Sequence, residues 1–171
     1  RFERRVDKDF DSSVSDNRSD LYTRVRVVFD FSYGKNVTGK IRYRYGHDMI
    51  WTDNANYSTD RSDVDMAYAT YNMGSSQLTL GRQWYAKGVG RLWGSGNWGN
   101  VAQSFDGVRY TDKKLDVFGG RQAVSSSTIN PESTAAYISY KTGNLGEVTL
   151  YYKNNTKGTT DTEVYTLSDF Y

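Results

Sequence analysis

Residues 21–31 read Leu-Tyr-Thr-Arg-Val-Arg-Val-Val-Phe-Asp-Phe, and polarity alternates along them. The odd-numbered positions are almost all apolar, whereas the even-numbered ones carry Arg24, Arg26 and Asp30. Because successive side chains of a strand point to opposite faces, this period of two predicts a long β-strand. Residues 37–46 repeat the pattern, and the segment between them has the composition of a tight turn. The two segments are therefore predicted to form a hairpin.

Eight further segments have strand-like composition. They lie near residues 2–6, 63–72, 77–84, 105–111, 115–122, 134–141, 146–153 and 162–171. No segment has the apolar period of about 3.6 that marks a helix, and the single proline, Pro131, falls in a connection. The sequence thus predicts an all-β chain with ten strands.

The predicted connections alternate in length. Short ones lie near 33–36, 73–76, 112–114 and 142–146, and long ones near 8–20, 47–62, 85–104, 123–133 and 154–161. An up-and-down antiparallel transmembrane β-barrel has short turns at one rim and long loops at the other, so this rhythm favours that fold. A soluble β-sandwich and a lipocalin-like barrel are the alternatives.

Composition excludes several other classes. The 171 residues suit one domain, and 22 basic against 20 acidic residues give a net charge of +2, too even for a nucleic-acid-binding arm. Aromatic residues make up 15% of the chain, which argues against disorder. No apolar run approaches the roughly 18 residues of a membrane helix. With no cysteine and one histidine, thiol catalysis, disulfides and an ordinary zinc site are excluded, and no metal or cofactor is expected.

The two faces of the predicted strands differ in chemistry. If the apolar face meets lipid, it carries Val25, Val27, Phe29, Ile41, Tyr43, Val64, Met66, Tyr68, Leu78, Leu80, Val108, Tyr110, Ile138, Tyr140, Val148 and Leu150. The other face then carries Arg24, Arg26, Lys40, Arg42, Arg44, Asp65, Thr79, Arg109, Glu147 and Thr149. Charges this dense cannot form a dry core, so this face is expected to line water.

The longest predicted connection, 85–104, is rich in glycine and tryptophan. Residues 94–99 formally match the dinucleotide-binding pattern G-x-G-x-x-G. A predicted strand follows instead of a helix that could hold a pyrophosphate, so this interpretation is rejected. A loop that packs closely against other backbone, anchored by Trp93 and Trp98, explains the composition better.

Residues 80–118 resemble the signature region of the alginate-export-type outer-membrane porins. The resemblance rests on Leu80-Gly81-Arg82-Gln83, on Gly90-Arg91-Leu92-Trp93-Gly94-Ser95-Gly96-Asn97-Trp98-Gly99-Asn100, on Ser104-Phe105-Asp106-Gly107-Val108-Arg109-Tyr110 and on Leu115-Asp116-Val117-Phe118. The major porins of diderm bacteria that are anchored through S-layer-homology segments are similar in barrel pattern. The resemblance implies a passive channel in the bacterial outer membrane, not an enzyme, with the Gly/Trp loop folded into the lumen as a constriction. Such barrels have about 16–18 strands, so the chain is expected to be one barrel domain over 1–171, part of a larger barrel. A closed small barrel of ten strands is the alternative, because ten is an even number.

The expected mechanism is diffusion of small hydrophilic, preferably anionic, solutes past basic residues. The predicted pore-lining residues are Arg24, Arg26, Lys40, Arg42, Arg44, Arg82, Arg91 and Arg109, and the predicted constriction residues are Gly90, Trp93, Gly94, Gly96 and Trp98. A bulge at Gly81 would turn Arg82 inward, and without one Arg82 faces outward. Acidic pairing across the lumen, by Asp65, Asp106, Asp116 and Glu147, would weaken the selectivity.

Partners and competing functions complete the expectations. Outer-membrane lipid and small solutes are the expected partners, nucleic acid is not, and a homo-oligomer such as a trimer stays open. A structural anchor or adhesin barrel is the main alternative. A barrel hydrolase would depend on His47 beside Asp48, with Ser58 or Ser62 as nucleophile. A loop calcium site would use Asp53, Asp60, Asp63 and Asp65, which lack EF-hand spacing.

Overall fold

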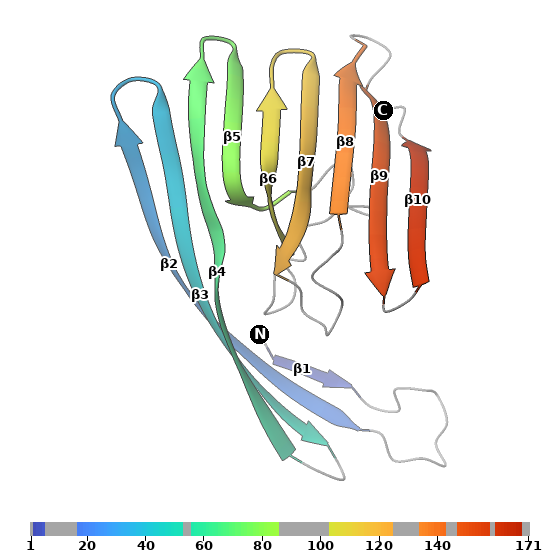
Figure 1. Cartoon of the computed structure of the whole chain (residues 1–171). Coiled ribbons are helices and arrows are strands. Elements are labelled where there is room, and N and C mark those ends of the chain that lie inside the picture. The colour runs from blue at the N-terminus through green and yellow to red at the C-terminus, as the bar shows by residue number, and fades with distance from the viewer. Residues whose placement is uncertain are drawn as a thin grey trace.

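The computed structural model describes residues 2–5, 17–52, 56–85, 103–124, 134–142, 147–157 and 160–168. These residues form ten strands and no helix (Figure 1). The strands are β1 (Phe2–Arg5), β2 (Arg18–Tyr33), β3 (Val37–Thr52), β4 (Asn56–Met73), β5 (Ser76–Gln83), β6 (Ser104–Thr111), β7 (Leu115–Val124), β8 (Thr134–Lys141), β9 (Glu147–Lys157) and β10 (Thr160–Ser168). No helix in this described part is long and apolar enough to cross a membrane.

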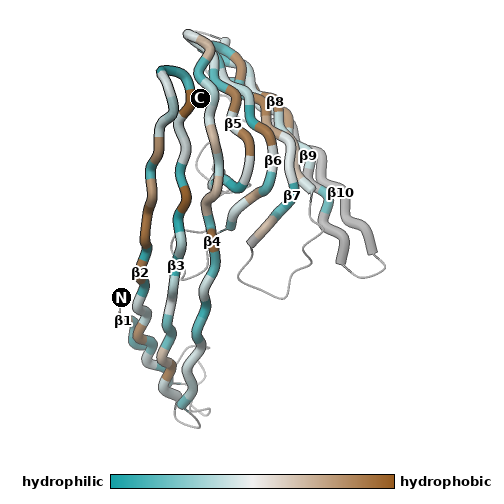
Figure 2. Tube along the Cα trace, turned by 60° about the vertical axis from the view of Figure 1, so that its left-hand side comes forward, coloured by the Kyte–Doolittle hydropathy of each residue, from teal (hydrophilic) through white to brown (hydrophobic). Residues whose placement is uncertain are grey.

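The ten strands form a single sheet in chain order, and every neighbouring pair is antiparallel. This up-and-down topology confirms the predicted fold class. Within the described residues β1 and β10 are the two sheet edges and do not pair with each other. The sheet is curved and open (Figures 1 and 2), as expected of part of a barrel wall.

Two of the predicted long connections are wrong. Residues 47–62 were expected to form a loop, but β3 and β4 pair down to Trp51↔Asn56, which leaves only 53–55 between them. Residues 154–161 are likewise mostly strand, with only 158–159 between β9 and β10. These segments are polar, and polar segments are typical of loops. Their polar side chains bind partners on the neighbouring strand, as His47 binds Asp60, and the sequence does not reveal such pairs. The long β2, β3 and β4 extend well beyond β5–β10 at this end, where β1 pairs with β2 (Figure 1).

The predicted separation of faces is confirmed on β2 and β3. Partners in register share a face, so Val27↔Tyr43 and Phe29↔Ile41 lie on an apolar face, and Arg26↔Arg44 lies on the opposite, charged face. Apart from Ser104, which lies at a register shift, every buried side chain on the strands belongs to the charged face, where side chains crowd together. The exposed large hydrophobic side chains belong to the apolar face, except Val28 and Tyr57.

A β-bulge in β4 changes the predicted face of two residues. Arg42 pairs with Met66, whereas the next residue, Tyr43, pairs with Val64, so Asp65 is the extra residue. The bulge shifts the alternation by one, and Met66 and Tyr68 therefore lie on the charged face, opposite Arg42 and Lys40. Their expected placement on the apolar face is wrong for this reason.

An aromatic cluster on the charged face of β6–β8 supplies the apolar packing. It comprises Tyr85, Phe105, Phe118, Ala135 and Tyr137, all buried, with Tyr151 packed against them. The ring centroids of Tyr85 and Tyr137 are 4.3 Å apart in a stacked arrangement.

The paired residues Gly107 and Gly120 leave room for the Phe118 ring. A Cβ atom at Gly120 would lie 2.8 Å from Phe118 Cζ, and one at Gly107 would lie 3.0 Å from Phe118 Cε2. Side chains at these two positions would displace the ring from the aromatic cluster.

The face assignment predicts different costs for two adjacent substitutions. Val27 and Val28 are both 44% exposed but lie on opposite faces. Val27→Arg should destabilise the inserted barrel by about 2–4 kcal/mol, because the guanidinium would face lipid. Val28→Arg should destabilise the inserted barrel clearly less. Urea unfolding of both variants in lipid vesicles measures the difference, and equal costs would contradict the face assignment.

Candidate pore-lining face

The predicted basic residues of β2 and β3 lie together on the charged face. Arg24 and Arg26 are on β2, and Lys40, Arg42 and Arg44 are on β3. Arg26 lies directly opposite Arg44, and Val28 lies opposite Arg42. Like charges this close repel, so the arrangement requires compensating charges or water.

Two carboxylates of β4 compensate the central arginines. Arg42 Nε and Nη2 donate to Asp65 Oδ1 and Oδ2 at 2.7 and 2.8 Å, a bidentate pair. Arg44 donates through Nη2 to Asp63, and its Nε lies 3.7 Å from Asp65 Oδ2. The side chain of Asp65 is 0% exposed and that of Arg44 is 1% exposed. Ions buried to this degree are tolerable only with close partners, so these four residues form one unit.

The β4 bulge lies within this unit. In regular alternation Asp63 and Asp65 would share one face of the sheet, and Met66 would lie on the other face. The bulge keeps Asp63, Asp65 and Met66 all on the charged face, with Asp65 between the rows of Arg42 and Arg44. Re-aiming a side chain is a common role of a β-bulge.

Similar pairs lie at other points of this face, between neighbouring strands. Arg109 on β6 makes a bidentate pair with Asp116 on β7, with both distances 2.9 Å, and Tyr137 on β8 donates to Asp116 Oδ1 at 2.7 Å. Lys40 pairs with Asp30 at 2.9 Å in a more exposed position. The pairing of Asp65 and Asp116 is thus lateral, along the wall, and not across a lumen as expected.

Arg82 lies on the apolar face, unlike the other described residues predicted to line the pore. It shares a register row with Ala67 and Asp106, and no register shift occurs at Gly81. Arg82 makes a bidentate pair with Asp106, with distances of 2.8 and 2.9 Å. The outward alternative in the sequence analysis is therefore the one observed.

Gly81 is nevertheless a special position. Its φ is +114°, a conformation that side-chain-bearing residues rarely adopt, and an added Cβ would lie 2.4 Å from the Ala67 carbonyl oxygen. Glycine therefore permits a local distortion of the backbone just before the chain leaves the sheet.

Two aromatic residues that follow β5 lie over the charged face, and sequence reasoning did not single them out. The guanidinium carbon of Arg42 lies 3.7 Å from the centroid of the Trp84 ring, and that of Arg26 lies 5.0 Å away. Tyr85 instead stacks on Phe118 and Tyr137, in β7 and β8. The two consecutive rings thus contact strands on both sides of β5, so the chain enters the space in front of the charged face.

The return of the chain to the sheet is also buried, and Phe105 lies on the charged face in the row of Gln83 and Gln122. Ser104 is 0% exposed and Phe105 is 2% exposed. The predicted constriction residues Gly90, Trp93, Gly94, Gly96 and Trp98, together with Arg91, lie outside the described residues.

The residues around His47 do not form the predicted hydrolase site. His47 Nδ1 lies 2.5 Å from Asp60 Oδ1, and Tyr45 donates to the same oxygen at 2.7 Å. These residues are on the apolar face, whereas Asp48 follows on the charged face. Neither Ser58 nor Ser62 has a hydrogen bond to His47 in the described structure.

The described residues of the predicted calcium site lie on two different faces of the sheet. Asp60 belongs to the apolar face, and Asp63 and Asp65 bind arginines on the other face. No group of three or more possible metal ligands occurs among the described residues. Asp53 lies outside them.

The curved single-layer sheet has an exposed apolar face and a face of ion-paired polar residues, as the wall of an outer-membrane β-barrel has. Residues 1–164 match the family described as Alginate export. The chain belongs to this family of outer-membrane export channels. A comparison with individually curated proteins gave no significant match.

The ion-paired unit predicts a large cost for losing one carboxylate. Asp65→Asn leaves two buried guanidinium groups without their shared anion, and we expect a loss of about 3–5 kcal/mol in the free energy of unfolding. Asp30→Asn is the matched control, because its pair with Lys40 is exposed and should cost less than about 1 kcal/mol. Urea unfolding in lipid vesicles measures both, and a small cost for Asp65→Asn would show that the unit is not needed for stability.

Proposed function

We propose that this chain forms part of the wall of an outer-membrane channel that passes small hydrophilic solutes and prefers anions. The observation that carries the proposal is the excess of basic residues on the charged face of β2–β4. The basic residues there outnumber the acidic ones by two: Arg18, Arg24, Arg26, Lys40, Arg42, Arg44 and Arg61 against Asp20, Asp30, Asp48, Asp63 and Asp65.

A net positive wall lowers the electrostatic barrier for an anion that enters a narrow aqueous path and raises it for a cation. The lateral ion pairs reduce this effect, because each carboxylate cancels most of the field of its partner at a distance. The selectivity is therefore expected to be moderate and to depend on Arg24 and Arg26, the bases on the strand next to the paired unit. It should also weaken as salt rises, since the Debye length is about 10 Å at 0.1 M and about 3 Å at 1 M.

We further propose that the segment between β5 and β6 narrows the channel. Support comes from both ends of the segment: Trp84 and Tyr85 contact the charged face as the chain leaves β5, and Phe105 is buried there as it returns. A connection anchored in this way at both ends is favoured to lie in front of that face. Trp84, stacked on Arg42, then stands at the entry to the narrow section.

Charge selectivity is tested by the reversal potential across a planar bilayer with a salt gradient. The full-length parent should prefer anions, and Arg24→Gln/Arg26→Gln should bring the permeability ratio toward about 1. Arg121→Gln is the control, because Arg121 is exposed on the apolar face and its loss should leave the ratio unchanged. A cation-selective parent would overturn the preference, and a barrel that does not conduct would favour the anchor or adhesin alternative.

The constriction is tested by shortening the segment. Deletion of residues 87–98 should leave Trp84 and Tyr85 in place and raise the single-channel conductance, because the narrowest section dominates the resistance. Near-ultraviolet circular dichroism serves as the control that the barrel is still folded. An unchanged conductance in a folded barrel would place this segment outside the conducting path.

A further inference from the structure

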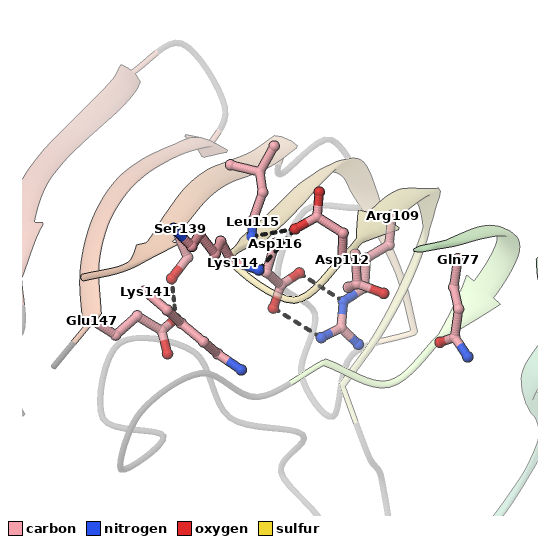
Figure 3. A pocket seen from close by; sticks show the side chains of 10 residues that line it. Gln77, Arg109, Asp112, Lys114, Leu115, Asp116, Ser139, Lys141 and Glu147 are labelled. Carbon is pink, nitrogen blue, oxygen red and sulfur yellow. Dashed lines mark hydrogen bonds and ion pairs between the residues drawn. The ribbon is translucent and has the colours of Figure 1, made fainter. Parts of the chain in front are cut away.

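A polar pocket lies on the charged face at the rim that carries the β2–β3, β4–β5 and β6–β7 turns. Its volume is about 320 Å³, and it is lined by the start of β5, the β6–β7 turn and the ends of β8 and β9 that meet there (Figure 3). In barrels of this architecture the short turns are on the periplasmic side. The pocket is separate from the Arg42–Asp65 unit of β3 and β4.

The carboxylates in this pocket are already engaged by the protein. Asp116 holds Arg109, and Glu147 accepts a hydrogen bond from Ser139 (Figure 3). Asp112 Oδ1 accepts hydrogen bonds from the backbone N–H groups of Leu115 and Lys114, both at 2.8 Å. These two bonds hold the pKa of Asp112 below its ordinary value, so it stays ionised as the cap of the turn.

Two cationic side chains of the pocket form no ion pair with the described residues. Lys114 and Lys141 line it, both are exposed, and neither ammonium group has an ion-pair partner among the described residues. Figure 3 shows the Lys141 side chain reaching between Glu147 and Arg109. Backbone contact fixes the two positions relative to each other, because the Lys141 N–H donates to the Lys114 carbonyl oxygen at 2.8 Å.

Neutral hydrogen-bonding groups complete the lining. Gln77 donates its amide to Asn72 at 3.0 Å, which leaves its side-chain carbonyl oxygen as an acceptor. Thr111 also lines this pocket and carries a hydroxyl group. Two ammonium groups beside neutral acceptors suit a ligand that carries an oxyanion on a hydroxylated body. The volume is at the lower end of the range for small-molecule sites, so the body is about the size of one sugar unit.

We propose that this pocket binds small hydroxylated organic anions, with the oxyanion held by Lys114 and Lys141 and the hydroxyl groups held by Gln77 and Thr111. The site would collect such solutes at the short-turn mouth before they reach the arginines of the wall. Its place in transport rests on the proposed function, whereas binding itself does not.

Isothermal titration calorimetry at low salt on the full-length protein in detergent micelles tests the proposal. The probes are gluconate, glucose 6-phosphate, glucose and acetate, which separate the carboxylate, the phosphate, the hydroxyl groups and the bare charge. We expect binding in the millimolar range for at least one of the two hydroxylated anions and none for glucose. Binding of only one of these two anions would identify which oxyanion the site takes. Acetate that binds as tightly as gluconate would overturn the role of the hydroxyl groups.

Matched variants locate the binding. Lys114→Gln/Lys141→Gln should weaken the affinity at least about 10-fold, because the charge-assisted bonds are lost. Lys35→Gln removes a charge from the β2–β3 turn at the same rim and should change nothing. Equal loss in both variants, no effect of the double substitution, or no binding of either hydroxylated anion would overturn the proposal.

Planar-bilayer recordings on the same preparation separate this inference from the proposed function. A conducting channel that binds neither anion refutes the pocket and leaves the channel intact. A non-conducting protein that binds gluconate through Lys114 and Lys141 refutes the channel and leaves the pocket intact.

Discussion

The ion-paired unit around Asp65 is the constraint on which the charged face depends. Buried charges cost several kcal/mol each unless close partners and hydrogen bonds replace water. Arg42 and Arg44 meet this condition because β4 supplies Asp63 and Asp65, and because the bulge places Asp65 between them. The bulge also brings Met66 and Tyr68 onto the charged face, opposite Arg42 and Lys40. The same lateral pairing recurs at Arg109 and Asp116, so the wall neutralises most of its charge within itself.

A single-layer sheet can satisfy two solvents at once. In a transmembrane barrel, alternation gives one face to lipid and the other to water, and no second apolar layer is needed. The extra packing comes from the aromatic cluster around Phe118 and Tyr137, which Tyr85 joins from the chain beyond β5. The segment that leaves the sheet is thus tied to the strands that follow it. This explains how a wall with so many polar residues also fixes the start of a long connection.

Much of this architecture could be predicted from the sequence. The ten strands and the faces of β2 and β3 follow from period-two alternation, because each strand carries its own pattern. The up-and-down order was predicted from the lengths of the connections, although two of these lengths were wrong. The faces of Met66 and Tyr68 could not be predicted, since a bulge is decided by pairing with β3 and leaves no mark in β4 itself. The long β3–β4 hairpin was missed for a similar reason: pairs such as His47 and Asp60 look like loop residues until the partner strand is known. The role of Trp84 depends on contacts with distant strands, which spacing does not reveal.

The central claim is that the charged face lines water while the opposite face meets lipid. The sequence contains no cysteine, so single cysteines can be introduced without background. Val27→Cys and Val28→Cys form a suitable pair, because the two side chains are equally exposed in the isolated chain, at 44%, and differ only in face. The measurement is the rate of modification by a charged, water-soluble methanethiosulfonate reagent, with the full-length barrel reconstituted in lipid vesicles. The account predicts rapid modification at position 28 and almost none at position 27, and equal rates, or faster modification at position 27, would contradict it.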